Sequence, residues 1–91
     1  MDEQKIAEVI EIYRNKLLEM GFVKRRFILN IPSPSFQGAL NHCLSMLDEM
    51  EIFIQEGRMD KVFRWLGFVQ GCLFTCGVYS VEELKDHNRP R

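Results

Sequence analysis

Residues 59–76, MDKVFRWLGFVQGCLFTC, constrain the fold of this chain more than any other stretch. Their spacing is helical, but the apolar side chains sweep about 200° of a helical wheel, against the roughly 100° stripe of an ordinary surface helix. We therefore expect this helix to be central, covered by two other helices of the chain or by one of them and a second subunit. Its apolar sector consists of Met59, Val62, Phe63, Trp65, Leu66, Val69, Cys72, Leu73, Phe74 and Cys76.

Two further segments show helical periodicity and can supply that cover. Residues 2–20 have one apolar stripe, and Gly21 is a natural stop for this helix. A second helix is expected to begin with Ser33 as N-cap and Pro34 as first helical residue, and to run to about Glu56. The first stripe contains Ile6, Val9, Ile10, Tyr13, Leu17 and Met20, and the core face of the second helix contains Phe36, Leu40, Cys43, Leu47, Met50 and Ile54. The connector between them is expected to pack Phe27, and Leu29 or Ile31, inward.

The remaining signals complete an all-α architecture. Only a tight turn at Gly57 separates the second helix from the third, about residues 58–76, so these two should form an antiparallel hairpin. After Gly77, Ser80 and Glu83 make a capping box for a short helix over about residues 81–87. We predict a single helical domain, residues 1–91: a small bundle of three main helices plus this short C-terminal helix, with a frayed tail from about residue 87 to 91.

Composition and charge narrow the classes of function. The formal net charge is −1, so no overall field attracts nucleic acid or an anionic membrane. Arg64 and Gln70 interrupt the longest apolar tract, which argues against a membrane span. The first residues are charged and amphipathic, unlike a signal peptide. Three cysteines without framework spacing suit a reducing compartment, so we expect a cytoplasmic protein.

A row of small residues, Gly67, Gly71 and Thr75, follows one side of the third predicted helix at four-residue spacing. Each glycine inside a helix costs about 1 kcal/mol relative to alanine, so a compensating contact is expected. One interpretation is the close approach of another helix, from this chain or from a second copy. The other is a shallow groove with Arg64 and Lys61 at its rim. The candidate interface residues are Trp65, Gly67, Phe68, Gly71 and Thr75.

Six basic residues suggest an alternative function. They fall into two groups, one in the connector and one at three-residue spacing on the third helix: Lys24, Arg25 and Arg26, and Arg58, Lys61 and Arg64. With Trp65, Phe68 or Tyr79 nearby, such cations could bind phosphate while an aromatic ring stacks on a base. The competing interpretation is that the helical group pairs with acidic residues of the second helix.

Signals for catalysis or metal binding are weak. Cys72 and Cys76 lie one helical turn apart and could bind a metal with Cys43 or His42, but the paired four-ligand spacing of a structural zinc site is missing. A nucleophile at Cys43 with His42 as its base is the corresponding enzyme hypothesis, and burial of the thiol opposes it. No phosphate loop or dinucleotide-binding motif occurs. We therefore expect no enzyme activity, no metal and no cofactor.

Three stretches resemble a known group of proteins. EGRMDKVFRWLGFVQG and GVYSVEELKDHNRP, and more weakly EVIEIYRNKLLEMGF, are similar to small uncharacterised proteins of tailed phages and prophages. The resemblance implies a mobile-element origin and the cytoplasm of a bacterial host, and it supplies no catalytic residues. Small accessory proteins of this kind bind a host factor, hold a defence signal nucleotide, or adjust replication and transcription.

These observations predict a non-enzymatic accessory factor that self-associates through its third helix. We expect a homo-oligomer, with a dimer favoured, that binds a host protein and no membrane. The alternative is a nucleotide-binding sponge or nucleic-acid accessory protein that uses the basic and aromatic surface of the third helix.

Overall fold

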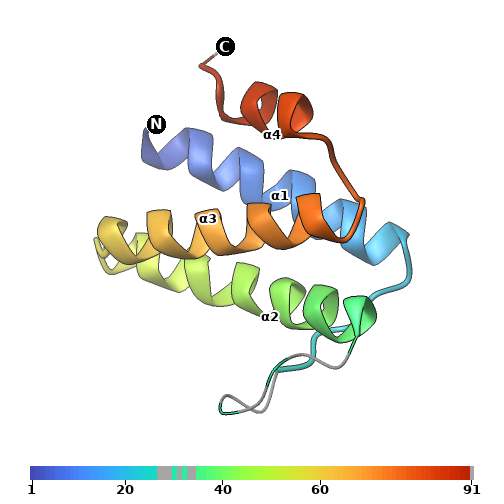
Figure 1. Ribbon diagram of the computed structural model, residues 1–91. Helices are drawn as coiled ribbons and strands as arrows, with labels where there is room; N and C mark the ends of the chain where they lie inside the picture. The colour runs from blue at the N-terminus through green and yellow to red at the C-terminus, as the bar shows by residue number, and fades with distance from the viewer. Residues whose placement is uncertain (27–29, 31, 33–34, 91) are drawn as a thin grey trace.

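The residues that the structure describes form four α-helices (Figure 1). The computed structural model describes residues 1–26, 30, 32 and 35–90. The helices are α1 (Glu3–Glu19), α2 (Phe36–Gln55), α3 (Met59–Thr75) and α4 (Val81–Asn88), and the described residues contain no strand. The predicted all-α class is therefore confirmed. Within these ranges, no helix has both the length and the apolar character that crossing a membrane requires.

Local capping sets the ends of α1 and α4. The carboxylate of Asp2 accepts a 2.8 Å hydrogen bond from the backbone N–H of Lys5, and Gly21 follows α1 with a φ of 90°. The predicted capping box is present at α4. There the Glu83 N–H donates to Ser80 Oγ at 3.1 Å, and the Ser80 N–H donates to Glu83 Oε1 at 2.9 Å. Because each of these contacts spans three residues, the sequence alone could reveal it.

The start of α2 differs from the prediction. Ser35, rather than Ser33, is the N-cap, and its hydroxyl accepts a 3.0 Å hydrogen bond from the Gly38 N–H. A Ser-Pro-Ser run offers two hydroxyl groups for this role, and the pattern alone does not distinguish them. Ser33 and Pro34 lie outside the described residues. So do the three connector residues that were expected to pack inward, Phe27, Leu29 and Ile31.

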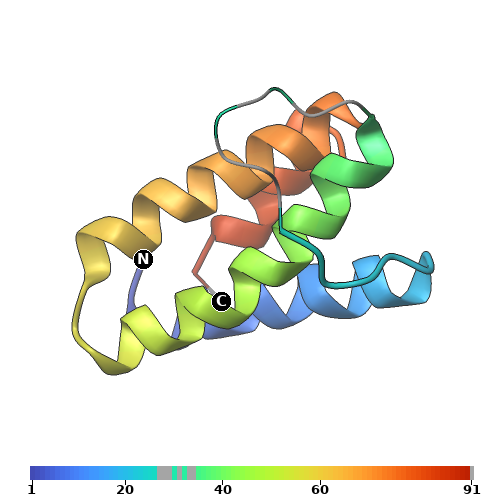
Figure 2. The ribbon, with the colours of Figure 1, turned by 90° about the horizontal axis from the view of Figure 1, so that it is seen from below.

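α2 packs closely against both α1 and α3, and α4 lies on α1. The chain reverses at Gly57, which has a φ of 73°, and α3 then runs back beside α2 in both views (Figures 1 and 2). A positive φ of this size favours glycine because it has no Cβ to clash with the backbone. The glycine in the turn is thus the local cause of the pairing between α2 and α3.

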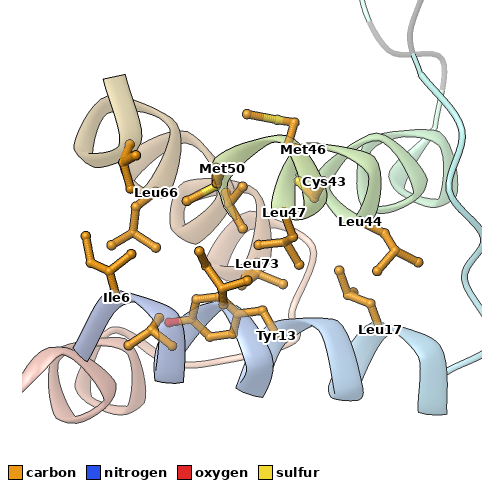
Figure 3. Close-up of a cluster of buried hydrophobic side chains, with 14 of the residues drawn as sticks. Ile6, Tyr13, Leu17, Cys43, Leu44, Met46, Leu47, Met50, Leu66 and Leu73 are labelled. Atoms are coloured by element: carbon orange, nitrogen blue, oxygen red, sulfur yellow. The ribbon is translucent and has the colours of Figure 1, made fainter. Parts of the chain in front are cut away.

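One apolar core joins the helices, and Figure 3 shows its centre, where Tyr13 and Leu17 of α1 face α2. Two residues that the predicted stripes included, Met20 and Phe36, are exposed instead. Met20 is the C-cap of α1 and Phe36 is the first residue of α2, so both lie at helix ends beyond the packed faces. The buried core consists of Ile6, Val9, Ile10, Tyr13, Leu17, Leu40, Cys43, Leu44, Met46, Leu47, Met50, Val62, Leu66, Val69, Leu73 and Leu84.

α3 is not the central helix that its sequence predicts. It buries only a narrow stripe, made of Val62, Leu66, Val69 and Leu73. Two other residues of its apolar arc, Phe63 and Phe74, are 41% and 52% exposed. Other helices of the described chain therefore do not cover the whole apolar arc of α3, and the expectation that a second subunit completes the cover stays a prediction. α2 takes the middle position because its buried residues face both α1 and α3.

The C-terminal residues are held more firmly than predicted. The frayed tail was expected to begin at about His87, but α4 continues to Asn88. His87 Nδ1 lies 3.0 Å from the hydroxyl oxygen of Tyr13, and Asn88 Oδ1 accepts a 2.8 Å hydrogen bond from Gln70. Contacts with α1 and α3 therefore hold the last turn of α4, which includes the first two residues of the expected tail.

Candidate interaction surface on α3

The outer face of α3 contains a groove along the row of small residues. At Gly67 and Gly71, no other described side chain, and no backbone atom outside the surrounding helix, lies within 4 Å of where a Cβ would be. These glycines therefore do not serve the approach of another described helix of this chain. The groove has a volume of about 570 Å³ and is lined by Ser35, Phe36, Ala39, Gly67, Phe68, Gly71, Cys72, Thr75 and Cys76.

Exposed phenylalanines flank this row on both sides. Phe36 and Phe68 line the groove and are 64% and 48% exposed. At 100° per residue, the half-exposed Phe63 and Phe74 fall on the opposite side of the glycine row. The face thus presents a valley of small residues between protruding aromatic rings. Among the described residues, no charged side chain lines the groove.

Trp65 lies apart from the other predicted interface residues. Its ring packs edge-on against Phe53, with 4.9 Å between the ring centroids, and the ammonium group of Lys61 lies 5.4 Å from its ring centroid. The structure thus brings together four of the predicted interface residues in one groove, Gly67, Phe68, Gly71 and Thr75, and leaves Trp65 outside it.

The basic residues of the connector face α2. Lys24 Nζ lies 2.6 Å from Asp48 Oδ2, and Arg26 pairs with Glu49. The backbone N–H of Arg25 donates a 3.3 Å hydrogen bond to the Asn41 carbonyl. Acidic residues of α2 therefore neutralise two of the three connector cations.

The basic residues of α3 are neutralised less. Arg58 lies 3.4 Å from Glu56 and over the ring of Phe53, and Lys61 Nζ lies 4.5 Å from the centroid of the same ring. Among the described residues, no ion pair engages Lys61 or Arg64. The interpretation that this group pairs with acidic residues of the second helix therefore holds for Arg58 alone. All three cations line one hollow of about 310 Å³.

Arg64 also borders a second hollow, between α2 and α3. This hollow measures about 420 Å³ and is lined by His42, Met46, Arg64, Trp65 and Phe68. The rings of His42 and Phe68 meet edge to face, 6.3 Å apart. Burial lowers the pKa of His42, and the charge of Arg26 lowers it further, against the opposing effect of Glu49. Neutral imidazole, two aromatic rings and one guanidinium group therefore meet in this hollow.

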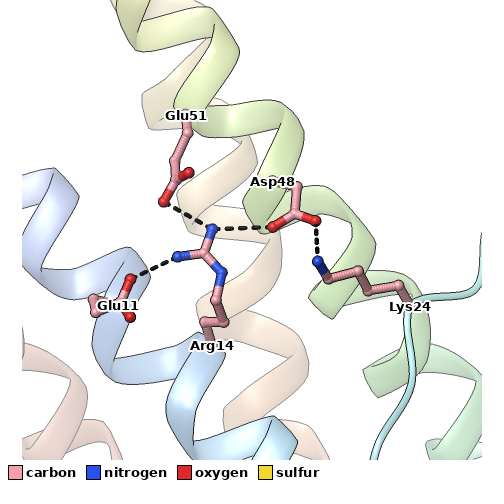
Figure 4. A network of polar contacts seen from close by, with 5 residues as sticks. All are labelled: Glu11, Arg14, Lys24, Asp48 and Glu51. Carbon is pink, nitrogen blue, oxygen red and sulfur yellow. Dashed lines mark hydrogen bonds and ion pairs between the residues drawn. The ribbon is translucent and has the colours of Figure 1, made fainter.

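Arg14 forms an ion-pair network that the sequence analysis missed (Figure 4). Its guanidinium group lies 2.6 Å from Glu11, 3.0 Å from Asp48 and 2.7 Å from Glu51, and Asp48 also contacts Lys24. Burial opposes the charge of Arg14, but hydrogen bonds to Glu51 and Asp48 outweigh it and raise the pKa. The network ties α1 and the connector to α2, which is a structural role. No local pattern indicates it, because Arg14 and Asp48 are far apart in the chain.

A second network, also missed, joins α1, α3 and α4. The buried Tyr13 hydroxyl accepts a 2.9 Å hydrogen bond from the Gln70 amide and lies 3.0 Å from His87 Nδ1. Gln70 and Asn88 exchange two further hydrogen bonds, of 2.8 and 3.3 Å. The available signal was Gln70 itself, a polar residue that interrupts an apolar tract at the edge of the buried stripe of α3.

The three cysteines gather where α2 and α3 pack. Cys43 is buried, and half-buried Cys72 and Cys76 line the groove. Cys43 does not point in the same direction as His42, because consecutive helical residues are rotated by about 100°. The part of the chain that the structure describes contains no group of three or more His, Cys, Asp or Glu residues that could hold a metal ion.

Comparison with known proteins adds no relative to this description. Neither a protein-family model, nor a curated protein, nor a solved structure matches the chain. The surface of α3 is therefore the feature from which a function can be proposed, and the resemblance to phage proteins stays a prediction.

Proposed function

We propose that this protein is a non-enzymatic interaction protein that forms a homodimer through the exposed face of α3. Its fold would be a bundle of three main helices, in which the antiparallel hairpin of α2 and α3 presents that face. The observation that supports the proposal most directly is the uncovered row of Gly67 and Gly71 between exposed phenylalanines. Two helical glycines cost about 2 kcal/mol relative to alanine, and contacts within the described chain do not offset this.

A second copy of the same chain fits the face in shape. In a twofold dimer the same patch meets itself, so the patch must contain both protrusions and hollows. Phe68 and Phe36 are the protrusions, and the valley along Gly67 and Gly71 is the hollow that could receive their counterparts. Small residues at such a crossing let two helix backbones approach closely.

Charge also favours a second copy. Residues near a twofold axis meet their own counterparts, so a charged lining would bring like charges together. The groove lining contains no charged side chain, and the nearby cations of α3 line other hollows. Self-association at this face therefore requires neither like-charge repulsion nor the desolvation of an ion.

Sedimentation velocity of the wild type and of Phe68→Glu tests the proposal. We expect a dimer for the wild type and a dimer weakened at least about tenfold for Phe68→Glu, because the variant buries an unpaired carboxylate in the contact. Leu18→Glu is the matched control, since Leu18 on α1 is 49% exposed and Phe68 is 48% exposed. This control should still dimerise. A wild-type monomer at high micromolar concentration, or equal weakening by both variants, would contradict the proposal.

The biological setting that we propose follows from the resemblance to small proteins of tailed phages and prophages. In that setting, the dimer would be an accessory factor in the bacterial cytoplasm that binds a host protein. The experiment is affinity purification from a bacterial lysate with the wild type and Phe68→Glu in parallel. A host protein recovered in stoichiometric amount with either form supports the proposal. No such protein with either form contradicts it.

A nucleotide-binding function is the second candidate, and the hollow between α2 and α3 favours it. Arg64 has no ion pair among the described residues, and it lies beside Trp65 and Phe68 around this hollow. A guanidinium group next to aromatic rings suits a phosphate and a base. Trp65 is the single tryptophan, so its fluorescence reports binding directly. Addition of a nucleoside triphosphate should change the fluorescence of Trp65, and this change should become smaller as the salt concentration rises. In Arg64→Gln the change should be absent. A salt-independent response, or none, would exclude this function.

A further inference from the structure

Arg64 borders two hollows of different chemical character. The hollow of about 310 Å³ at the start of α3 is lined by the cations Arg58, Lys61 and Arg64. The hollow of about 420 Å³ between α2 and α3 contains the aromatic rings of Trp65 and Phe68 in its lining. Because Arg64 belongs to both linings, the cationic hollow and the aromatic hollow adjoin at its side chain.

The cationic hollow has a net positive charge. Its charged lining residues are the three cations and one carboxylate, that of Asp60. Glu56 lies 3.4 Å from Arg58 and neutralises part of its charge. Among the described residues, no ion pair engages Lys61 or Arg64, so these two side chains hold most of the charge that remains for an anion.

Aromatic rings position Lys61 without neutralising it. Its ammonium nitrogen lies 4.5 Å from the ring centroid of Phe53 and 5.4 Å from that of Trp65. A ring face attracts the charge but does not cancel it, so the ammonium group can still donate hydrogen bonds to phosphate oxygens. Lys61 and Phe68 share one side of α3, because seven residues make almost two full turns, and they are about 10 Å apart along the helix axis. The sugar and phosphate chain of a nucleotide can bridge this span.

We propose that the two hollows form one binding site for a nucleoside polyphosphate, with the base in the aromatic hollow and the terminal phosphates in the cationic hollow. The first phosphate contacts Arg64, and the terminal phosphates contact Lys61 and Arg58. Because this site rests on the nucleotide-binding function proposed above as the second candidate, its own prediction concerns the class of nucleotide. Affinity should increase with the number of phosphates.

Titration of Trp65 fluorescence with adenosine and with its mono-, di- and triphosphate tests the site. The protein is kept submicromolar, because Phe68 also lines the groove of the proposed dimer, and divalent cations are removed by a chelator. We expect the Kd of the triphosphate to be at least about tenfold lower than that of the monophosphate, since the added phosphates form charged hydrogen bonds. Inorganic triphosphate, measured by competition, should bind at least about tenfold more weakly than adenosine triphosphate, because it has no base to stack.

Lys61→Gln separates the contribution of the cationic hollow from that of the aromatic hollow. This variant should raise the Kd of the triphosphate about tenfold and leave that of the monophosphate within about twofold. Lys85→Gln is the matched control, because it removes the same charge from an exposed lysine of α4 that lines neither hollow. This control should change neither constant. Circular dichroism checks that both variants are folded.

The results that would overturn the proposal are distinguishable from one another. Equal affinity for the monophosphate and the triphosphate, or equal weakening by Lys61→Gln and Lys85→Gln, would exclude the cationic hollow while nucleotide binding itself stands. Inorganic triphosphate that binds as tightly as adenosine triphosphate would exclude the aromatic hollow. If none of the adenosine ligands binds, the nucleotide-binding function is itself contradicted.

Discussion

The side-chain amide of Gln70 on α3 donates a 2.9 Å hydrogen bond to the hydroxyl of Tyr13 on α1, in the interior of the protein. The same hydroxyl lies 3.0 Å from His87 Nδ1 on α4. A single buried oxygen atom therefore joins three helices. No described buried side-chain nitrogen or oxygen lacks a hydrogen-bond partner, so the few polar groups of this apolar interior are hydrogen-bonded.

Replacing Tyr13 by Phe should destabilise the protein by about 1–2 kcal/mol. The variant keeps the ring but removes the buried oxygen that Gln70 and His87 share, and the loss of hydrogen bonds to a buried hydroxyl costs about this much. Urea unfolding followed by Trp65 fluorescence measures the change. Tyr79→Phe is the control, because the partly buried Tyr79 packs its ring against those of Tyr13 and His87, while the described hydrogen bonds of the network do not involve its hydroxyl. Equal losses of unfolding free energy in the two variants would contradict a particular contribution of the Tyr13 hydroxyl to stability.

Because the hydroxyl of Tyr13 is buried, we expect the protein to lose stability at alkaline pH. Burial raises the pKa of Tyr13 from 10.0 to about 12, although the hydrogen bond from Gln70 acts in the opposite direction. The stabilisation is therefore complete below pH 10, and it is lost as pH rises from 10 towards 12, because the unfolded chain releases the proton first. The stability advantage of the wild type over Tyr13→Phe should shrink across this range. Urea unfolding of both proteins at about pH 9 and pH 11 measures it, and a constant difference would contradict the shifted pKa.

Replacing Arg14 by Gln should cost about 1–2 kcal/mol of stability, more than the loss of an ordinary surface pair. Arg14 contacts three carboxylates, and its side chain is only 16% exposed. Its removal leaves Asp48 and Glu51 of α2 facing Glu11 without the intervening cation. Lys5→Gln is the control, since Lys5 contacts a single carboxylate, that of Glu8, at 3.8 Å. Thermal unfolding of both variants measures the difference. A loss below about 0.5 kcal/mol for Arg14→Gln would mean that solvent screens the network.

Alanine at Gly67 and Gly71 should have opposite effects on folding and on self-association. Each Cβ would point into open space, so the double variant should gain up to about 2 kcal/mol in folding stability from helix propensity. The same methyl groups would hold two α3 helices apart and weaken the proposed dimer. Thermal unfolding at low concentration and sedimentation at high concentration measure the two effects.

Gly57→Ala provides the contrasting control. Gly57 has a φ of 73°, where a side chain is strained, so this variant should lose about 1 kcal/mol of stability. If Gly67→Ala/Gly71→Ala dimerises as strongly as the wild type, α3 does not approach a second copy closely.

Much of the helical framework could be predicted because its signals are local. The glycine at the end of α1 and the capping box of Ser80 and Glu83 each act over a few residues. The two Ser residues around Pro34 show the limit of this approach. Both are suitable N-caps by type, and only the course of the backbone selects Ser35.

The candidate surface could be predicted in part. The spacing of Gly67, Gly71 and Thr75 correctly placed them in one row, because helical periodicity determines which residues share a face. The same wheel did not show that Trp65 packs on Phe53 and lies outside the groove. Nor did it show that Phe36 of α2 lines the same groove as Phe68, since that depends on how two helices are placed.

By itself, the sequence determined the helical class, the approximate helix ends and the residues that share each helix face, because these depend on interactions between residues close in the chain. The tertiary structure decided that α2 lies in the middle and that much of the apolar arc of α3 stays exposed. It also decided that the hydroxyl of Tyr13 meets Gln70 and His87. These relationships join residues on different helices, and they depend on which faces are left over once the helices have packed.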